Sequence, residues 1–523
     1  MTKKVLWSDF HSNLHPGRLD QLESWYDFAK EMLDFWALAY YPFHHRLSEK
    51  GLPLEDVIPE ERRDADWEAI REFAMEKEGD GFPFYMGYEW QGNGEDGDHN
   101  VFYRHNDQAM THPMTYKELC DNIPLGDAMA IPHHPGYAVG HRGKNWATHD
   151  YRYSPFTEIF SSHGSSESDF DDIPLNVHIH MGPRDSKGTV MSGLNNGAIT
   201  GIICSGDNHV SSAITGNGFL GLWADSDDKD TIFDALLNRQ VYGVTRSRIE
   251  LYYTLNDALM GSFIEHKEDD RYAVNVEVEA TNALDRIEVI RNGIVEDTYI
   301  HNGKWEKDKI EGIVRFKFEL EMGWGPDLRV YPDINEKIWK GSVKTTGKIH
   351  DVEKLWTSPG SKIIEYQDEK VDFEIVTRKG HAGNGKLSQK NHSTPYIQNQ
   401  AMIFEIEADV NSTIQIDLDG TTYEYIVSDI LKDSDLVGLV DDSKTLAREK
   451  FEKDDFYRSD PFWHNAYKFK VHRGVPEKAY KVNYQCELEG IDGDEQDYVM
   501  VKVHQRNGEK AWSSPVWITK ATK

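Results

Sequence analysis

The spacing of apolar residues changes near residue 249, and this change limits the folds open to the chain. Up to about residue 248, short apolar runs alternate with segments of helical periodicity, a pattern typical of parallel strands joined by crossover helices. From residue 249 onward, apolar and polar residues alternate one by one, with Asn-Gly and Asp-Gly hairpin signals. We therefore predict an α/β part over 1–248 and an antiparallel, sandwich-like β part over 249–523.

Short apolar runs predict the strands of the first part. They cover residues 5–7, 35–39, 84–88, 101–103, 128–131, 159–160 and 201–204. A helix with one apolar face is predicted between the first two strands from residues at helical spacing, namely Leu19, Leu22, Tyr26, Ala29 and Leu33. Another helix is predicted over 230–239, which has Asp near its start and Arg in its last turn.

In the second part, the segment from about 324 to 400 stands apart. It is rich in Gly, Lys and Pro and shows no clean periodicity. Long stretches of this kind are typical of loops, so we predict a loop-rich insertion there.

Net charge limits the kinds of partner that the chain can bind, and cysteine content limits the residues that could hold a metal. Its 523 residues include 58 basic and 90 acidic ones, and the resulting net charge of −32 repels nucleic acid and anionic membrane surfaces. The three cysteines form no CxxC pattern, so any metal must be held by His, Asp or Glu. The N-terminus lacks the apolar core of a signal peptide, and no apolar run of membrane-spanning length occurs. We predict a cytoplasmic protein without nucleic-acid or membrane partners; the sequence does not indicate its oligomeric state.

Histidines and acidic residues follow the predicted strands of the first part repeatedly. The C-terminal ends of parallel strands are where α/β proteins assemble their sites. A single histidine beside a strand is more often an ordinary buried or surface residue, but six such places together indicate a metal cluster. Imidazole and carboxylate ligands suit Zn²⁺, Mn²⁺ or Fe²⁺. The six places are 9–13, 87–90, 99–100, 131–136, 158–164 and 205–209.

Glu89 could bridge two of these ions. Two ions about 3.5 to 4 Å apart activate a water and bind the oxygens of a displacement reaction. Such an arrangement favours hydrolysis.

These segments resemble the motifs of the PHP (polymerase and histidinol phosphatase) superfamily of metal-dependent hydrolases, and within it the branch that includes carbaryl hydrolases. The similarity covers about residues 5–248 and continues more weakly through SRIELYYTLND, DRIEVIRNG and AWSSPVWI. The motifs that carry it are DFHSN, GYEWQG, GDHNVFYR, IPHHPGY, GHRGKNW, FTEIFSSHGSSE and CSGDNH.

The resemblance implies a distorted seven-stranded (β/α) barrel whose rim holds one to three divalent metal ions, which we expect to be Mn, Zn or Fe. The ligands that it implies are His11, Glu89 as the bridge, His99, His134, His163, Asp207 and His209. Asn13 stands where the superfamily often has a second histidine; its amide oxygen could ligate an ion or bind substrate.

A larger departure lies at the end of the strand over 35–39. The superfamily usually has Thr-Asp-His there, whereas this chain has Ala39, Tyr40 and Tyr41. The chain could hold fewer ions, or His44 and His45 could replace the missing ligands. Alternatively, the tyrosines contact substrate, which makes Tyr40 a candidate catalytic residue, or they simply pack at the barrel rim.

Three polar residues near the predicted ligands have open roles. His133 could act as a general acid or orient His134. Arg142 and Lys144 lie in a Gly-containing loop and could bind an anionic substrate group, although either alone could be a solvated loop charge. In the second part, Trp324 could line the substrate or pack in a core.

Together these features predict a metal-dependent hydrolase that directs a metal-activated water at a phosphoester, or at a related ester, carbamate or amide. The substrate would be a small or oligomeric anionic molecule. The alternative is a non-catalytic or weakly catalytic binding protein with a degenerate barrel and a glycan- or partner-binding β part. The missing Asp-His pair favours this alternative, and the other retained ligands oppose it.

Overall fold

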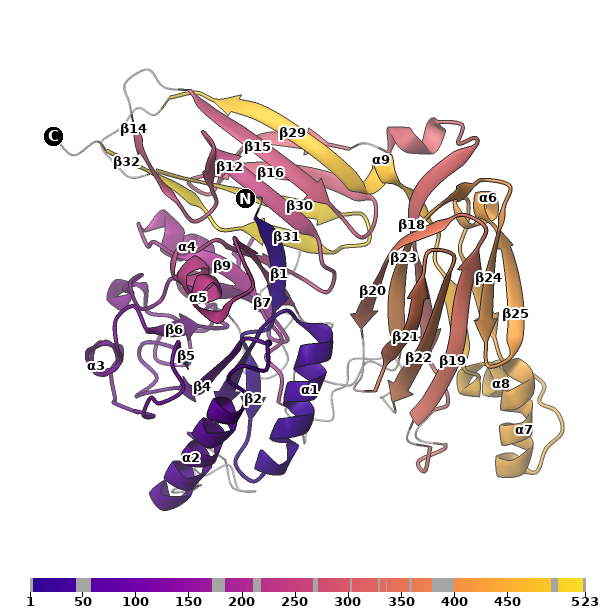
Figure 1. Cartoon of the computed structure of the whole chain (residues 1–523), viewed down its shortest axis with the longest axis horizontal. Helices are drawn as coiled ribbons and strands as arrows, with labels where there is room; N and C mark the ends of the chain where they lie inside the picture. The colour runs from indigo at the N-terminus through magenta and orange to yellow at the C-terminus, as the bar shows by residue number, and fades with distance from the viewer. Residues whose placement is uncertain are drawn as a thin grey trace.

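The fold combines many β-strands with a few helices, as Figure 1 shows. The computed structural model describes residues 3–43, 58–171, 184–209, 218–266, 271–301, 303–327, 330–334, 336–356, 360–378, 399–490 and 497–520. His44 and His45, named above as possible replacement ligands, lie outside the described residues.

The first part contains the predicted alternation of strands and helices. Its strands are β1 (Lys4–Ser8), β2 (Ser12–Leu14), β3 (Trp36–Tyr40), β4 (Phe84–Trp90), β5 (His99–Tyr103), β6 (Ala128–Pro132), β7 (Phe156–Ser161), β8 (Gly164–Ser165), β9 (Gly201–Cys204), β10 (Phe219–Ala224) and β11 (Val241–Val244). Its helices are α1 (Leu22–Met32), α2 (Glu60–Glu76), α3 (Tyr116–Asn122), α4 (Val190–Asn195) and α5 (Lys229–Leu237). The seven predicted strands and both predicted helices are confirmed.

Hydrogen bonding joins the described strands of the first part into three groups. Strands β2, β3 and β4 are parallel, and β5 runs antiparallel between β4 and β6. Strands β7 and β9 are parallel, whereas β1, β10 and β11 pair antiparallel. The first part is therefore mixed α/β, and a closed seven-stranded barrel is not shown.

The reversal at β5 has a local cause. The short connection from β4 contains Gly92, Gly94 and Gly97 at positive φ, and glycine allows the backbone to turn back there. Antiparallel strands can be joined by such short turns, whereas parallel strands need a longer crossover.

The second part is built almost entirely of antiparallel strands. They are β12 (Glu250–Leu255), β13 (Ala258–Leu259), β14 (Phe263–His266), β15 (Tyr272–Glu279), β16 (Leu284–Arg291), β17 (Ile294–Ile300), β18 (Ile313–Gly323), β19 (Glu336–Thr345), β20 (Lys348–Trp356), β21 (Lys362–Gln367), β22 (Lys370–Arg378), β23 (Gln400–Asp409), β24 (Thr413–Leu418), β25 (Thr421–Ile426), β26 (Asp435–Gly438), β27 (Lys468–Val471), β28 (Val475–Pro476), β29 (Lys481–Leu488), β30 (Asp497–Gln505), β31 (Lys510–Ser513) and β32 (Val516–Lys520). The helices are α6 (Val427–Ile430), α7 (Val440–Phe451), α8 (Asp460–Asn465) and α9 (Glu477–Tyr480). The parallel pairing of β14 with β32 departs from this pattern.

The segment predicted to be a loop-rich insertion differs from that prediction. Residues 336–378 contain the four strands β19 to β22, and residues 379–398 lie outside the described residues. The lysines and glycines that obscured the periodicity alternate with buried residues such as Trp339, Val343 and Phe373. These side chains belong to a core shared by sheet β20-β23-β18-β27-β26 and sheet β21-β22-β19-β24-β25.

One sheet runs across residue 248. It places β1, β10 and β11 of the first part beside β31, β30, β16 and β17 of the second. Tyr242 pairs with Ser513, and Val244 pairs with Ala511. The division of the chain at residue 248 therefore stays a prediction, because hydrogen bonding is continuous across it.

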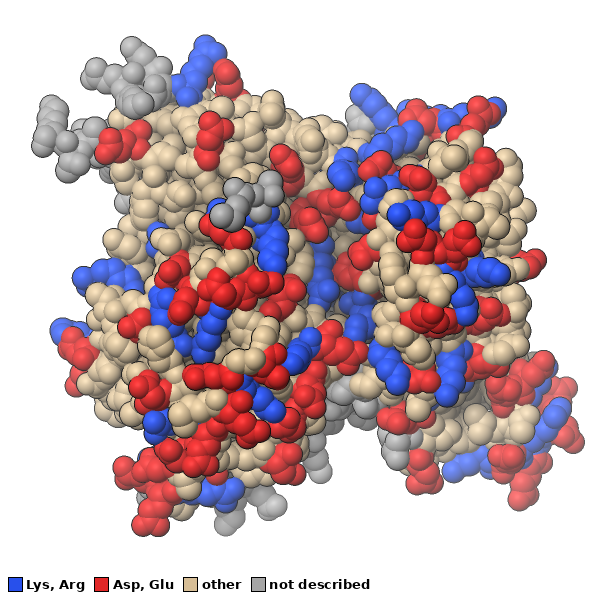
Figure 2. Space-filling view, viewed as in Figure 1, with Lys and Arg blue, Asp and Glu red and all other residues tan. Residues whose placement is uncertain are grey.

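Acidic side chains are widely spread over the face of the molecule drawn in Figure 2. Figure 2 shows them over the ends of the molecule formed by α1 and α2 and by α7 and α8, mixed with Lys and Arg. Among the described residues, no helix combines the length and the apolar character needed to cross a membrane.

Candidate metal centre

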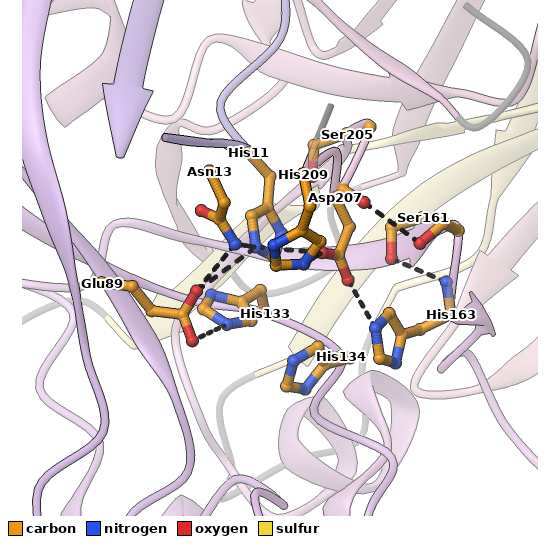
Figure 3. Close-up of polar contacts among 12 residues, drawn as sticks. His11, Asn13, Glu89, His133, His134, Ser161, His163, Ser205, Asp207 and His209 are labelled. Carbon is orange, nitrogen blue, oxygen red and sulfur yellow. Dashed lines mark hydrogen bonds and ion pairs between the residues drawn. The ribbon is translucent and has the colours of Figure 1, made fainter. Parts of the chain in front are cut away.

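Histidine and carboxylate side chains from several strand ends meet in one buried cluster, drawn in Figure 3. His11 lies between β1 and β2, Glu89 is on β4, and His133 and His134 follow β6. His163 lies between β7 and β8, and Asp207 follows β9. The side chains point toward one another, as expected for ligands that converge on cations.

These residues form three overlapping groups whose possible ligand atoms all lie within 4.8 Å of one another. The groups are His11-Glu89-His133, Asp98-His133-His134 and His134-His163-Asp207. Every member except His163 is at most 3% exposed. Sharing of His133 and His134 makes the three groups one continuous centre.

Several potential ligand atoms in the centre are buried without a hydrogen-bond partner. They include both ring nitrogens of His133 and Nδ1 of His134. Buried polar atoms in folded proteins are nearly always satisfied. Imidazole nitrogens that lack hydrogen-bond partners are able to coordinate divalent cations.

Glu89 lies between two imidazoles. Its Oε2 is 3.9 Å from His11 Nε2, and its Oε1 is 3.7 Å from His133 Nε2. Asn13 donates a hydrogen bond of 2.8 Å to Glu89 Oε2, and the Asn13 amide oxygen is buried without a partner. Asn13 thus contacts the centre through the carboxylate.

The other end of the centre is formed by His163 and Asp207. His163 Nε2 lies 2.8 Å from Asp207 Oδ2, and the Tyr137 hydroxyl lies 2.9 Å from His163 Nδ1. The second contact leaves Nε2 as the ring nitrogen directed at the centre.

Backbone conformation helps to direct the ligands. His134 has φ 34° and Asp207 has φ 51°, both in the left-handed region that non-glycine residues rarely adopt. Successive residues on an extended strand point to opposite faces. The turn at His134 allows it and its neighbour His133 to reach the same centre.

Charge sets the protonation states of the ligands. Although burial opposes ionisation, His11 and His133 hold the pKa of Glu89 well below its usual value. Burial also opposes ionisation of Asp207, but the nearby histidines, above all His11, hold the pKa of Asp207 well below its usual value. Burial lowers the pKa of His134. Burial opposes protonation of His11, but Asp207 and Glu158 hold its pKa well above its usual value. A metal ion binds a neutral imidazole, so binding at His11 would release a proton.

Two buried carboxylates fix the ligands from behind. Glu158 Oε2 lies 2.8 Å from His11 Nδ1, and Glu158 Oε1 accepts a hydrogen bond of 3.0 Å from the His134 backbone N–H. Asp9 accepts hydrogen bonds from the backbone N–H groups of His11, at 3.0 Å, and Gly206, at 2.8 Å. Carboxylates that bind the far nitrogen of a ligand histidine orient its ring.

Sequence reasoning did not single out Asp9, Asp98 or Glu158 as site residues. All three stand within the segments quoted above, so an acidic residue beside a strand end was the available signal. Whether such a residue faces the centre depends on which side of the strand it occupies. The sequence does not determine this to within one residue.

Two predicted site residues do not reach the cluster. His99 Nε2 lies 3.0 Å from Lys144 Nζ, and its ring stacks on Tyr116. The Tyr40 hydroxyl donates to Asp66 on α2 at 2.8 Å. In both cases the adjacent residue faces the centre instead, because neighbouring strand residues point to opposite sides.

Tyr41, the residue after Tyr40, lies at the edge of the centre. Its ring centroid is 4.9 Å from that of His15 and 5.2 Å from that of His209, and Gln91 Nε2 donates to its hydroxyl at 3.3 Å. His209 Nε2 lies 3.3 Å from Asp207 Oδ1. The structure thus brings His209 beside the three groups but not into them.

Arg142 lies beside Asp98 at the same edge. Its Nη1 is 3.1 Å from Asp98 Oδ2, and its side chain is 28% exposed. A guanidinium that is partly open to solvent beside a buried centre can contact an anionic group.

No protein-family model matches the chain, and no curated protein matches it in sequence. Among solved structures, the chain is similar to a two-domain protein from Bacteroides vulgatus ATCC 8482 that contains a predicted PHP-like metal-dependent phosphoesterase. The two share 11% identity with a TM-score of 0.30, over 81% of this chain and 95% of that one. At so low a TM-score, support for a function comes from the residues of this chain alone.

Proposed function

We propose that the chain is a metal-dependent hydrolase whose centre is the cluster of His11, Glu89, Asp98, His133, His134, His163 and Asp207. The observation that carries the proposal is the convergence of buried histidine and carboxylate ligand atoms in three overlapping groups, some of these atoms having no hydrogen-bond partner. A mixed set of imidazoles and carboxylates fits one to three ions of Mn, Zn or Fe.

Divalent ions bound there would lower the pKa of a water molecule toward about 7 and polarise the bond to be hydrolysed. Glu89, between His11 and His133, would be the residue that bridges two such ions. The ring nitrogens of His133 have no hydrogen-bond partner, and Nε2 faces Glu89, which favours a ligand role over that of a general acid. Glu158 and Asp9 hold the ligand geometry, which keeps the centre preorganised for the reaction.

The edge of the centre supports an anionic substrate. Arg142 is partly exposed there and would bind a phosphate or carboxylate group, while Tyr41 would contact the substrate next to it. We propose a phosphoester as the first substrate class, and a carbamate, ester or amide as the second. The PHP-like barrel and the carbaryl-hydrolase branch remain the predictions made from the motifs.

Metal analysis tests the proposal directly. Protein purified without chelator is expected to contain one to three equivalents of Mn, Zn or Fe, measured by elemental analysis. Chelation should abolish hydrolysis of an aryl phosphate or an aryl carbamate, and readdition of one of the metals should restore it. Replacement of the exposed His105 by alanine is the control and should change neither result.

Absence of metal after reconstitution would contradict the proposal and favour the binding-protein alternative. Metal binding without activity on either substrate would leave the centre in place but contradict the proposed substrate classes.

The two tyrosines give a paired prediction. Tyr41→Phe is expected to lower kcat/KM, because it removes a hydroxyl at the edge of the centre. Tyr40→Phe should leave kcat/KM unchanged and lower the free energy of unfolding by about 1 kcal/mol, the typical value of one hydrogen bond, here to Asp66. Steady-state kinetics and urea unfolding of both variants check this prediction, and the reverse pattern would show that Tyr40 faces the substrate.

A further inference from the structure

Four ionisable side chains are buried together between the two parts of the chain. Lys502 on β30 lies 2.6 Å from Glu167 and 2.9 Å from Asp171, measured between Nζ and a carboxylate oxygen. Lys510 on β31 lies 2.9 Å from the same Asp171 oxygen. None of these side chains is more than 7% exposed. We call them the lysine–carboxylate cluster.

The two carboxylates belong to the segment that carries His163. This segment, residues 161–171, leaves β7 at Ser161 and includes only the two-residue strand β8. Backbone hydrogen bonds hold it at Ser162, Ser166 and Glu167, and side-chain contacts add to this anchoring. Arg184 donates to Ser166 Oγ at 2.7 Å and also to the carbonyl oxygen of His163.

The two lysines belong to a hairpin that is firmly built into the molecule. Strands β30 and β31 pair with each other, and β31 pairs with β11. Trp512 on β31 is fully buried, and Lys502 Nζ lies 5.4 Å from the centroid of its ring. The hairpin thus provides fixed positive charges against which residues 161–171 are held.

The stability of a buried ion pair depends strongly on its geometry. Taking charges out of water is costly, and the attraction repays the cost only when the partners are close and well oriented. Burial opposes ionisation of Asp171, but Lys502 and Lys510 hold its pKa well below its usual value. Displacement of the segment would leave a charge buried without its partner, so the lysine–carboxylate cluster favours a single position of the segment.

We propose that Lys502 and Lys510 are positioning residues for the metal centre, which they act on by holding Glu167 and Asp171 and thereby His163. This inference rests on the proposed function. The β30–β31 hairpin would then support the geometry of the centre, although no residue of the hairpin is proposed as a metal ligand.

The test uses the full-length protein and the ion held by His163. Lys502→Met should weaken the binding of one Zn²⁺ or Mn²⁺ equivalent about 10- to 100-fold, as loss of groups that hold ligands typically does, and leave the other equivalents unchanged. Lys502→Arg should restore most of the affinity. In a His163→Ala background, Lys502→Met should have no further effect, because both changes act on the same ligand.

The matched control is Arg291→Met, which breaks a largely buried ion pair of 2.7 Å with Asp497 on β30 but does not touch residues 161–171. It should leave metal affinity unchanged. Equal metal binding by Lys502→Met and wild type, or a full additional loss in the His163→Ala background, would overturn the proposal.

A second measurement covers the case in which Lys502→Met does not fold. Glu167→Gln keeps the contact between Lys502 and Asp171, and it should increase hydrogen exchange of residues 161–171 in metal-free protein. Unchanged exchange would overturn the positioning role. If wild type binds no metal, the proposed function fails, and the exchange measurement still decides whether the cluster holds the segment.

Discussion

Replacement of His134 by asparagine is expected to lower kcat/KM about 100-fold or more and to remove bound metal. His134 belongs to two of the three overlapping groups, so its loss weakens both. Loss of groups that only support ligands already costs about 10- to 100-fold, and a ligand itself should cost at least as much. Asparagine is chosen because it tolerates the left-handed backbone of this position, where φ is 34°.

Metal content and steady-state rates, measured on variants with native circular dichroism, check this expectation. The control is His141→Asn, which changes an exposed histidine of the same loop region and should leave both quantities at the wild-type level. Wild-type metal content and rate in His134→Asn would show that the centre is not the site of the reaction.

Truncation of Trp512 is expected to have the largest effect on stability. Trp512→Ala should lower the free energy of unfolding by about 3 to 5 kcal/mol, the range typical of large aromatic truncations in cores. The side chain is fully buried in a core that includes Ile159 and Ile202 of the first part and Met500 and Trp517 of the second. The cavity would open between strands of both parts.

Urea or thermal unfolding, followed by circular dichroism, checks this expectation. Trp463→Ala is the matched control, because Trp463 is 40% exposed and its truncation should cost far less. A separate unfolding transition for each part in Trp512→Ala would show that the shared core couples them. An unchanged midpoint would show that this core adds little to stability.

Local patterns in the sequence predicted the strands and most of the cluster. The apolar runs of the first part are short and clearly bounded, and most of them stand beside a histidine or an acid, whereas the strand over 35–39 ends in Ala39, Tyr40 and Tyr41. The strand ends marked the segments that hold the cluster, because strand ends in such folds converge. The choice of His11, Glu89, His134, His163 and Asp207 as ligands came from the resemblance to the PHP motifs.

Single-residue alternation limited the rest. The resemblance pointed to His99 and Tyr40, whereas Asp98 and Tyr41 face the centre. A shift of one residue moves a side chain to the opposite side of a strand. A histidine, a tyrosine or an acid can occupy either side, so residue type does not settle the choice. Glu158 stands within one of the motifs, but its contact with His11 depends on how the sheet that holds β7 is placed relative to the β1–β2 connection.

Long-range pairing was the other limit. The alternation of residues 336–378 was masked by lysine and glycine, although its buried positions hold Trp339 and Phe373. The pairing of β11 with β31 joins residues about 270 positions apart, such as Tyr242 and Ser513. No local pattern encodes such a partner.

That pairing has a consequence for the evolution and engineering of the chain. A fragment ending near residue 248 would expose β11 as an open edge, whose unpaired N–H and C=O groups invite association with other chains. The first part is therefore not a portable module that recombination could move by itself. A gene fusion that borrowed the metal centre would also have to carry the β30–β31 hairpin.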